Sequence, residues 1–241
     1  MKSRATSNAS VNKIKNGWRL EIPAGDSSSY RLAQIDDYFG LSRKSFPHQS
    51  LTLSLRAKAS NSSIPGTWGF GLWNDPFGMS LGFGGNRFRL PMLPNAVWYF
   101  SASAQNYLSF RNDKPARGFL AQSFRSPKFH PLLIAAGLVL PFSRKAARKI
   151  LSRVIDEESS APSVDVTQWH SYRFEWSAKR VVFYVDDVRV SETLVSPNAP
   201  LGLVIWIDNQ YAAFTPEGKI GFGVLENPEP AWIEIADLIL E

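Results

Sequence analysis

Short segments in which apolar and polar residues alternate occur along most of the chain. Successive side chains of a strand point to opposite faces, so this alternation is typical of strands with one buried face. Clusters of Gly, Pro, Asn, Asp and Ser separate the segments. Many short strands at this spacing predict an all-β sandwich or barrel. The predicted strands cover residues 18–22, 51–57, 68–73, 79–83, 96–103, 107–110, 171–176, 181–185, 188–190, 203–207, 219–224 and 232–240.

Residues 125–160 depart from this pattern and predict a helical insertion in the β domain. An apolar stretch at 132–140 ends at Pro141, and Ser143 is a suitable N-cap for a helix over residues 144–155. Helical periodicity places two kinds of side chain on opposite faces of this helix. The apolar face comprises Ala147, Ile150, Leu151 and Val154, and the basic face Lys145, Arg148, Lys149 and Arg153.

The N-terminal residues 1–17 are polar and rich in Ser, Asn and Lys. We therefore expect a flexible tail before one domain that spans residues 18–241. The tail lacks the apolar stretch of a secretory signal, which favours a cytoplasmic protein over a secreted one whose signal has been removed.

Several predicted strands, in residues 68–73, 78–84, 96–103 and 203–207, have one bulky face and one face of small residues and single aromatics. In 68–73 the second face holds Gly69, Gly71 and Trp73. In 96–103 we assign Ala96, Trp98, Phe100 and Ala102 to the core, and Val97, Tyr99, Ser101 and Ser103 to the open face. Glycine inside a strand often marks the close approach of a ligand, and tight packing is the alternative explanation. The open faces together predict a ligand-binding cleft. Its candidate residues are Trp73, Tyr99 and Trp206 for stacking, and Ser101, Ser103 and Asp208 for hydrogen bonding.

Composition narrows the possible chemistry. The 241 residues contain no cysteine and only three histidines, which excludes disulfides, thiolate zinc sites and a cysteine nucleophile and argues against a multi-histidine metal site. The net charge of +6 comes from one region: residues 125–155 hold seven basic residues and no acidic one. This local charge argues against a general nucleic-acid surface.

Two consecutive segments resemble a known family. Residues 169–176 contain Trp-His-Ser-Tyr and end in Trp176, and residues 183–190 contain Tyr-Val-Asp-Asp. They resemble the laminarinase-like (family 16) glycoside hydrolases of the concanavalin A-like lectin/glucanase superfamily, as do parts of residues 18–110 and 165–241. The resemblance implies a jelly-roll β-sandwich of two curved antiparallel sheets with a ligand cleft on the concave face.

The resemblance also implies where catalysis would occur. These enzymes carry their carboxylates on one strand, as Glu-x-Asp-x-Glu, and the matching segment here is 94–103. That segment contains no acidic residue, and none occurs anywhere from 77 to 112. By strand parity Val97, Tyr99 and Ser101 stand where the carboxylates would be. The resemblance therefore supports the fold and leaves enzymatic activity open.

Three functions follow as hypotheses. The first is a ligand-binding protein, most simply for carbohydrate, that has lost the catalytic dyad. The second is an enzyme of other chemistry acting on an apolar small molecule, with Tyr99 or Asp75 as the acid. The third is a glycosidase with relocated carboxylates.

No cofactor and no metal site are expected, apart from the structural calcium that the resemblance allows at Asp237. One carboxylate is weak support for an ion that takes six to eight oxygens. The basic helix 144–155 is interpreted as a solvated surface helix, as a lid over the cleft or as a peripheral membrane contact.

Overall fold

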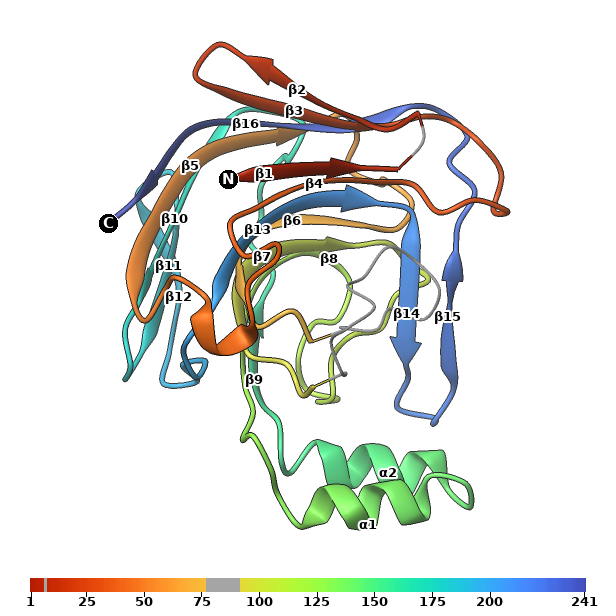
Figure 1. Cartoon of the computed structure of the whole chain (residues 1–241). Helices are drawn as coiled ribbons and strands as arrows, with labels where there is room; N and C mark the ends of the chain where they lie inside the picture. The colour runs from red at the N-terminus through yellow and green to blue at the C-terminus, as the bar shows by residue number, and fades with distance from the viewer. Residues whose placement is uncertain (7, 77–91) are drawn as a thin grey trace.

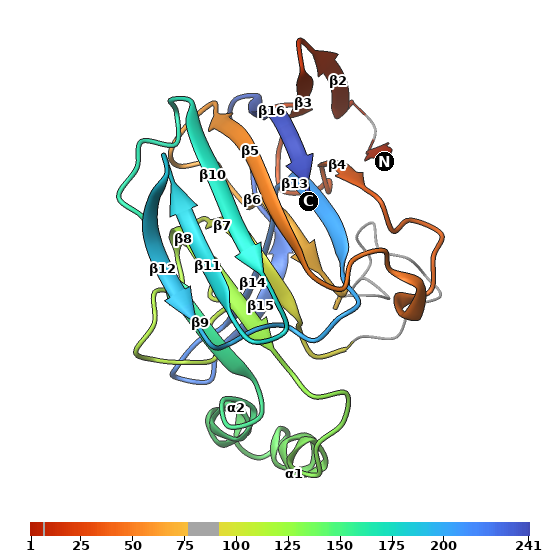
Figure 2. The ribbon, with the colours of Figure 1, turned by 90° about the vertical axis from the view of Figure 1, so that its left-hand side faces the viewer.

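The structure, a computed structural model, describes residues 1–6, 8–76 and 92–241. Two seven-stranded antiparallel sheets are stacked face to face, which confirms the predicted all-β jelly-roll sandwich (Figures 1 and 2). The first, sheet A, has the order β1 (Lys2–Ala5), β4 (Leu32–Asp36), β13 (Gly202–Asp208), β6 (Thr67–Trp73), β7 (Ala96–Ala102), β8 (Gly118–Arg125), β9 (Asp156–Ser160).

The second sheet, sheet B, covers one side of sheet A. Its order is β12 (Val188–Thr193), β11 (Val181–Val185), β10 (His170–Trp176), β5 (Leu51–Ala59), β16 (Ala231–Leu240), β3 (Gly17–Ile22), β2 (Ser10–Ile14). A separate hairpin of β14 (Gln210–Phe214) and β15 (Ile220–Val224) follows β13, and a short 3-10 helix occupies Arg43–Ser45. The main core lies between the two sheets.

Sheet A is packed on both of its faces. Along β5 of sheet B, buried residues alternate with partly or fully exposed ones, as expected for a sheet with one covered side. In contrast, every residue of β7 and β13 is buried. Residues with odd numbers in β7, such as Val97, join the main core, whereas Trp98 and Phe100 belong to a second apolar cluster on the concave side. This second cluster defines the concave face that could hold a ligand.

The N-terminal prediction was wrong. Residues 2–5 pair with β4 at the edge of sheet A, and residues 10–14 pair with β3 at the edge of sheet B. The polar composition of these strands reflects their position, because edge strands expose much of their surface and carry charged residues readily.

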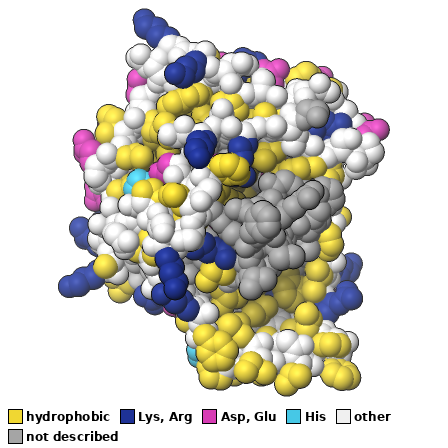
Figure 3. Space-filling model, in the orientation of Figure 1, with side chains coloured by type: hydrophobic (Ala, Val, Ile, Leu, Met, Phe, Trp, Pro, Cys, Tyr) yellow, Lys and Arg dark blue, Asp and Glu magenta, His cyan; other side chains and the backbone are white. Residues whose placement is uncertain are grey.

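The insertion is helical but shorter than predicted. It contains α1 (Leu132–Val139) and α2 (Arg144–Leu151), so α2 starts where predicted and ends four residues before 155. Residues 156–160 form β9 and pair with β8, so the end of the predicted insertion belongs to sheet A. The two helices project from one end of the sandwich, where hydrophobic side chains gather on the surface (Figure 3). The predicted strand 79–83 lies outside the described residues.

Candidate functional site

An aromatic cluster occupies the concave face of sheet A. It comprises Trp73 of β6, Trp98 and Phe100 of β7, and Trp206 of β13. The rings of Trp73 and Trp206 are parallel within 7°, with centroids 6.1 Å apart. The Trp98 centroid lies 6.0 Å from that of Trp73 and 5.6 Å from that of Trp206. The sequence analysis correctly placed Trp73 and Trp206 on one face, and the structure brings them together.

The glycines of β6 make room for these rings. Gly69 is opposite Phe100 on one side and Trp206 on the other. A Cβ atom at Gly69 would lie 2.4 Å from the Tyr99 carbonyl oxygen and 2.9 Å from Cη2 of Trp206. Both contacts are too short, so at Gly69 the packing explanation applies: the glycine accommodates an indole of the neighbouring strand.

The predicted parity of β7 was reversed. Tyr99 is fully buried in the main core, and its hydroxyl lies 2.7 Å from the carbonyl oxygen of Tyr184 and 3.0 Å from that of Arg173, both in sheet B. Ser101 shares this face. Tyr99 and Ser101 therefore do not face the concave side, and the residues that do are Trp98 and Phe100. Burial also raises the pKa of Tyr99 well above its usual value, so this phenol stays protonated.

Ser103 follows β7 and has a structural role. Its hydroxyl oxygen accepts hydrogen bonds from the backbone N–H of Gly66, at 3.2 Å, and from Nδ2 of Asn106, at 3.0 Å. These bonds fix the turn after β7 to the start of β6. The predicted ligand contact of Ser103 is therefore replaced by turn stabilisation.

Asp208 is a buried carboxylate at the end of β13, on the same face as Trp206. It accepts hydrogen bonds from Thr67 Oγ1 at 2.8 Å, from the Tyr30 hydroxyl at 3.3 Å and from the Gln210 N–H at 3.3 Å. Thr67 Oγ1 in turn accepts a bond from Nε1 of Trp206 at 2.9 Å. Burial raises the pKa of Asp208 to about 7, although these bonds oppose the rise. Near neutral pH this group can give or take a proton.

A second buried carboxylate, Glu157 of β9, was missed by the sequence analysis. It accepts hydrogen bonds from the Phe110 N–H at 2.8 Å and from Gln122 Nε2 at 3.2 Å. Gln122 Oε1 also accepts a bond from Nε1 of Trp98, at 3.1 Å. Burial raises the pKa of Glu157. Its place in the acidic run 156–158 gave no signal, because a run of charges is usually a solvated surface.

Asp208 and Glu157 are too far apart to act as one catalytic pair. Their strands, β13 and β9, are separated by β6, β7 and β8. Four strand spacings of about 4.8 Å separate the two strands. The register adds an offset along the strands, because Asp208 lies in the row of Gly118 and Glu157 is opposite Phe124. A pair of carboxylates in a glycosidase is about 5 to 10 Å apart.

Asp75 lies in the turn that follows β6. Its φ of 51° is left-handed, a conformation that Asp and Asn tolerate better than most residues, and Arg43 Nη2 donates to its carbonyl oxygen at 2.6 Å. Burial raises the pKa of Tyr38 well above its usual value, and the carboxylates of Asp75 and Asp36 raise it further. Asp75 is therefore a buried turn residue next to Tyr38, at the end of the strand that carries Trp73.

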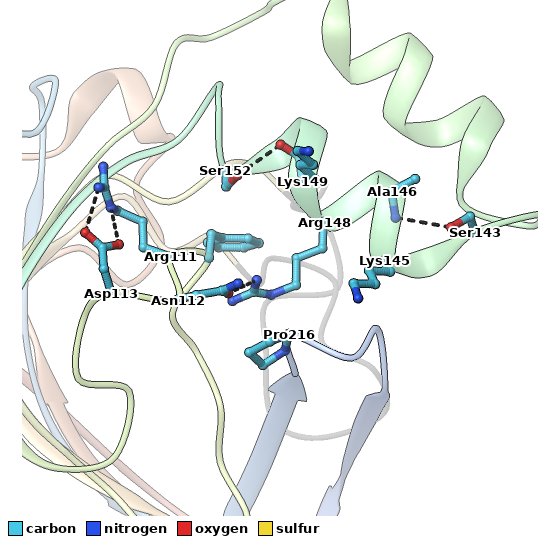
Figure 4. A pocket seen from close by; sticks show the side chains of 11 residues that line it. Arg111, Asn112, Asp113, Ser143, Lys145, Ala146, Arg148, Lys149, Ser152 and Pro216 are labelled. Atoms are coloured by element: carbon cyan, nitrogen blue, oxygen red, sulfur yellow. Dashed lines mark hydrogen bonds and ion pairs between the residues drawn. The ribbon is translucent and has the colours of Figure 1, made fainter.

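A basic pocket of about 690 Å³ lies between α2, the loop 110–113 and the turn of the β14–β15 hairpin (Figure 4). Arg148 reaches from α2 across this junction. Its Nε donates to the Phe214 carbonyl oxygen at 2.8 Å, its Nη1 to Asn112 Oδ1 at 2.6 Å and its Nη2 to the Ser109 carbonyl oxygen at 2.9 Å. Arg148 is 4% exposed, so its predicted place on the basic surface was wrong: it fastens α2 to the body.

Among the described residues, no group of three or more His, Asp or Glu side chains could hold a metal ion. Asp237 lies 3.5 Å from Arg56 Nη1 in a surface ion pair. The structural calcium at Asp237 stays a prediction.

Comparison with known proteins identifies the fold. No protein-family model matches the chain, and no curated protein matches it in sequence. Among solved structures, it is similar to LamAcat from Zobellia galactanivorans, with a TM-score of 0.52 and 15% identity over 97% of this chain and 80% of that one. LamA of the same organism in complex with laminaritriose and laminaritetraose gives the same TM-score and identity, over 97% and 81%.

A further match is the catalytic domain of an endo-1,3-β-glucanase (laminarinase) from Thermotoga petrophila, with a TM-score of 0.47, 12% identity, and coverage of 98% and 80%. The two LamA structures confirm the expectation of a laminarinase-like jelly roll at the level of the fold. The chain has the glycoside hydrolase-like jelly-roll β-sandwich of these enzymes, with the aromatic cluster on its concave face.

Proposed function

We propose that the concave face of sheet A binds an oligosaccharide and that the protein is a carbohydrate-binding member of this fold without the usual hydrolytic pair. One observation carries the proposal: three tryptophans, Trp73, Trp98 and Trp206, gather on the concave face beside Asp208. Sugar rings present apolar C–H faces that pack on aromatic rings. The structurally similar LamA is in complex with laminaritriose and laminaritetraose, which supports a β-glucan as the first ligand to test.

Trp73 is the ring through which a ligand would first make contact. It is only partly buried, whereas Trp98 and Trp206 are 5% and 7% exposed. The ring of Trp206 stacks parallel to the ring of Trp73. Asp208 lies deeper, with its carboxylate held by Thr67 and Tyr30, and would accept or donate one hydrogen bond according to pH.

The β7 strand argues for binding without hydrolysis. Its concave-facing residues are Ala96, Trp98, Phe100 and Ala102, and none can act as a nucleophile or proton donor. Two of the buried carboxylates, Asp208 and Glu157, lie on strands separated by β6, β7 and β8. Asp208 and Glu157 are therefore too far apart to form the pair that glycoside hydrolysis needs. Two others, Asp36 and Asp75, lie next to Tyr38.

Calorimetric titration with laminaritetraose tests the proposal. We expect saturable binding that weakens about three- to tenfold in Trp73→Ala, since an aromatic stacking contact contributes about 0.5–1.5 kcal/mol. Trp232→Ala is the matched control, because Trp232 is also partly buried but lies on sheet B under Arg19. Absence of binding to laminari-, cello- and mixed-linkage tetrasaccharides would contradict the proposal.

A second candidate ligand is an apolar small molecule, and one observation favours it. The polar atoms around the cluster already pair with one another, Trp98 with Gln122 and Trp206 with Thr67. Few remain for sugar hydroxyls, each of which costs about 1–3 kcal/mol if buried unpaired. Saturable binding of an apolar dye that Trp73→Ala abolishes, without any response to oligosaccharides, would establish this candidate instead.

A further inference from the structure

The helical hairpin of α1 and α2 stands apart from the sandwich. The two helices pack antiparallel on each other at one end of the molecule, and α1 is the outer one (Figures 1 and 2). The inner helix, α2, is held to the body by Arg148 and by Leu151, which packs on the concave-side cluster. The outer helix therefore has one covered side, and its other sides face outward.

The outward surface of this hairpin is apolar. All eight residues of α1 are Leu, Ile, Val, Ala or Gly. Helices on the surface of globular proteins normally present a polar face to water, and large exposed apolar patches mark contact sites. The exposed fractions are 90% for Phe142, 69% for Leu138, 65% for Phe129 and 59% for Ile134. Figure 3 shows hydrophobic side chains gathered at the lower end of the molecule, where Figure 1 places α1 and α2.

Exposed basic side chains occur in the same segment as this apolar end. Of the seven in residues 125–155, Arg148 is buried and Arg125 pairs with Asp156 at 2.8 Å. The others are exposed, and none forms an ion pair with a described residue. They are Lys128, Arg144, Lys145, Lys149 and Arg153. The exposed Glu217 is near Lys145: its pKa is lowered chiefly by a hydrogen bond with Thr215 and also by the charges of Lys219 and Lys145.

We propose that this hairpin is an interfacial anchor for a bilayer containing anionic lipid, with α1, Phe129 and Phe142 entering the headgroup–acyl boundary. An exposed apolar helix next to several exposed cations without an ion pair has the charge and polarity of such elements. A second copy of the chain fits less well. It would cover one more side of an all-apolar helix, and it would bring two clusters of unpaired cations together.

The dimensions agree with insertion into one leaflet. An eight-residue helix is about 12 Å long, far less than the roughly 30 Å of a bilayer core. No helix among the described residues is long and apolar enough to span a membrane. The three hydrogen bonds of Arg148 fix α2 to the body, so the sandwich would have a defined orientation above the lipid surface.

Vesicle flotation tests this proposal independently of the ligand. We expect the full chain to float with vesicles of phosphatidylcholine containing 30% phosphatidylglycerol, and less with phosphatidylcholine alone. L138D combined with F142D should weaken partitioning at least about tenfold, since each buried methylene contributes roughly 0.8 kcal/mol. L194D is the matched control, because Leu194 is 75% exposed on the sandwich itself. All these side chains are exposed, and a cooperative thermal transition in each variant checks its folding.

Two further readouts separate lipid insertion from other causes. Neutralising Lys128, Lys149 and Arg153 with glutamine should reduce binding to anionic vesicles roughly tenfold or more. The same change at the exposed Lys13, Lys15 and Lys179 should have a smaller effect.

A fluorescent probe gives the second readout. The chain has no cysteine, so an NBD probe attached to L138C reports one site. Its emission should shift to the blue with anionic vesicles, whereas a probe at L194C should not respond. Failure of the wild type to float, or equal flotation of L138D/F142D, would overturn the proposal. A dimer that L138D/F142D dissolves, without vesicle binding, would show that a second copy covers α1.

Discussion

Thr67 donates a hydrogen bond from Oγ1 to the Asp208 carboxylate over 2.8 Å, although the two residues are 141 positions apart in the chain. Thr67 opens β6 and Asp208 ends β13, and the antiparallel register places them opposite each other. The same hydroxyl accepts a bond from Trp206, so one threonine orients both the indole and the carboxylate of the concave face.

The raised pKa of Asp208 predicts that stability falls with rising pH. The carboxyl has a pKa of about 7 in the fold against 3.8 ordinarily, so the folded state binds more protons between these values. Its favourable contribution is complete below pH 4 and is lost as the pH rises to 7. We expect the free energy of unfolding to fall by a few kcal/mol less between pH 4 and pH 8 in Asp208→Asn than in the wild type. Urea denaturation across this pH range measures the difference. Identical pH profiles of the two proteins would contradict the assignment.

Glucan hydrolysis should be absent. The concave-facing positions of β7 carry no carboxylate, so we expect no reducing sugar from laminarin or from mixed-linkage β-glucan. The measurement is a reducing-end assay with an active laminarinase as the positive control. Activity that Asp75→Asn or Asp208→Asn abolishes would instead indicate a relocated acid.

Gly69→Ala should destabilise the sandwich. The new Cβ would meet the Tyr99 carbonyl oxygen at 2.4 Å and Trp206 at 2.9 Å, and overpacking of this kind costs about 1–3 kcal/mol. Gly137→Ala is the matched control, because a Cβ there has nothing within 4 Å and alanine favours a helix. Chemical denaturation of both variants gives the comparison, and an equal effect at the two positions would argue against the packing of Trp206 over β6.

Arg148→Met should loosen α2 and lower global stability by about 3 kcal/mol. It removes three hydrogen bonds and leaves the carbonyl oxygens of Ser109 and Phe214 without this partner. Lys149→Met, one residue along and exposed, should change stability by no more than about 0.5 kcal/mol. Thermal unfolding of both variants checks this, and similar transition temperatures would show that α2 does not depend on its arginine.

The sequence determined the class of fold and much of the residue grouping. Alternation with period two is a property of the strand itself, so it correctly grouped Trp98 with Phe100 and Trp73 with the glycines of β6. Helical periodicity and the Ser143 cap likewise placed the start of α2, and the Ser143 side chain accepts a hydrogen bond from the Ala146 N–H at 3.2 Å. These features depend on residues close together in the chain. They can therefore be predicted without knowing which distant residues pack against them.

Only the tertiary structure decided which of the two sets of side chains on a strand faces the main core. Sheet A is covered on both sides, so β7 has no solvent face, and its two sets of side chains differ in what covers them. Tyr99 enters the main core because sheet B supplies the carbonyl oxygens of Arg173 and Tyr184 to its hydroxyl. Arg148 and Glu157 are polar residues that sequence assigns to the surface, and only partners distant in the chain permit their burial. The local sequence pattern contains no information on such distant partners. For this reason the sequence assigned Tyr99 and Ser101 to the concave face, where the structure instead places Trp98 beside the predicted Trp73 and Trp206.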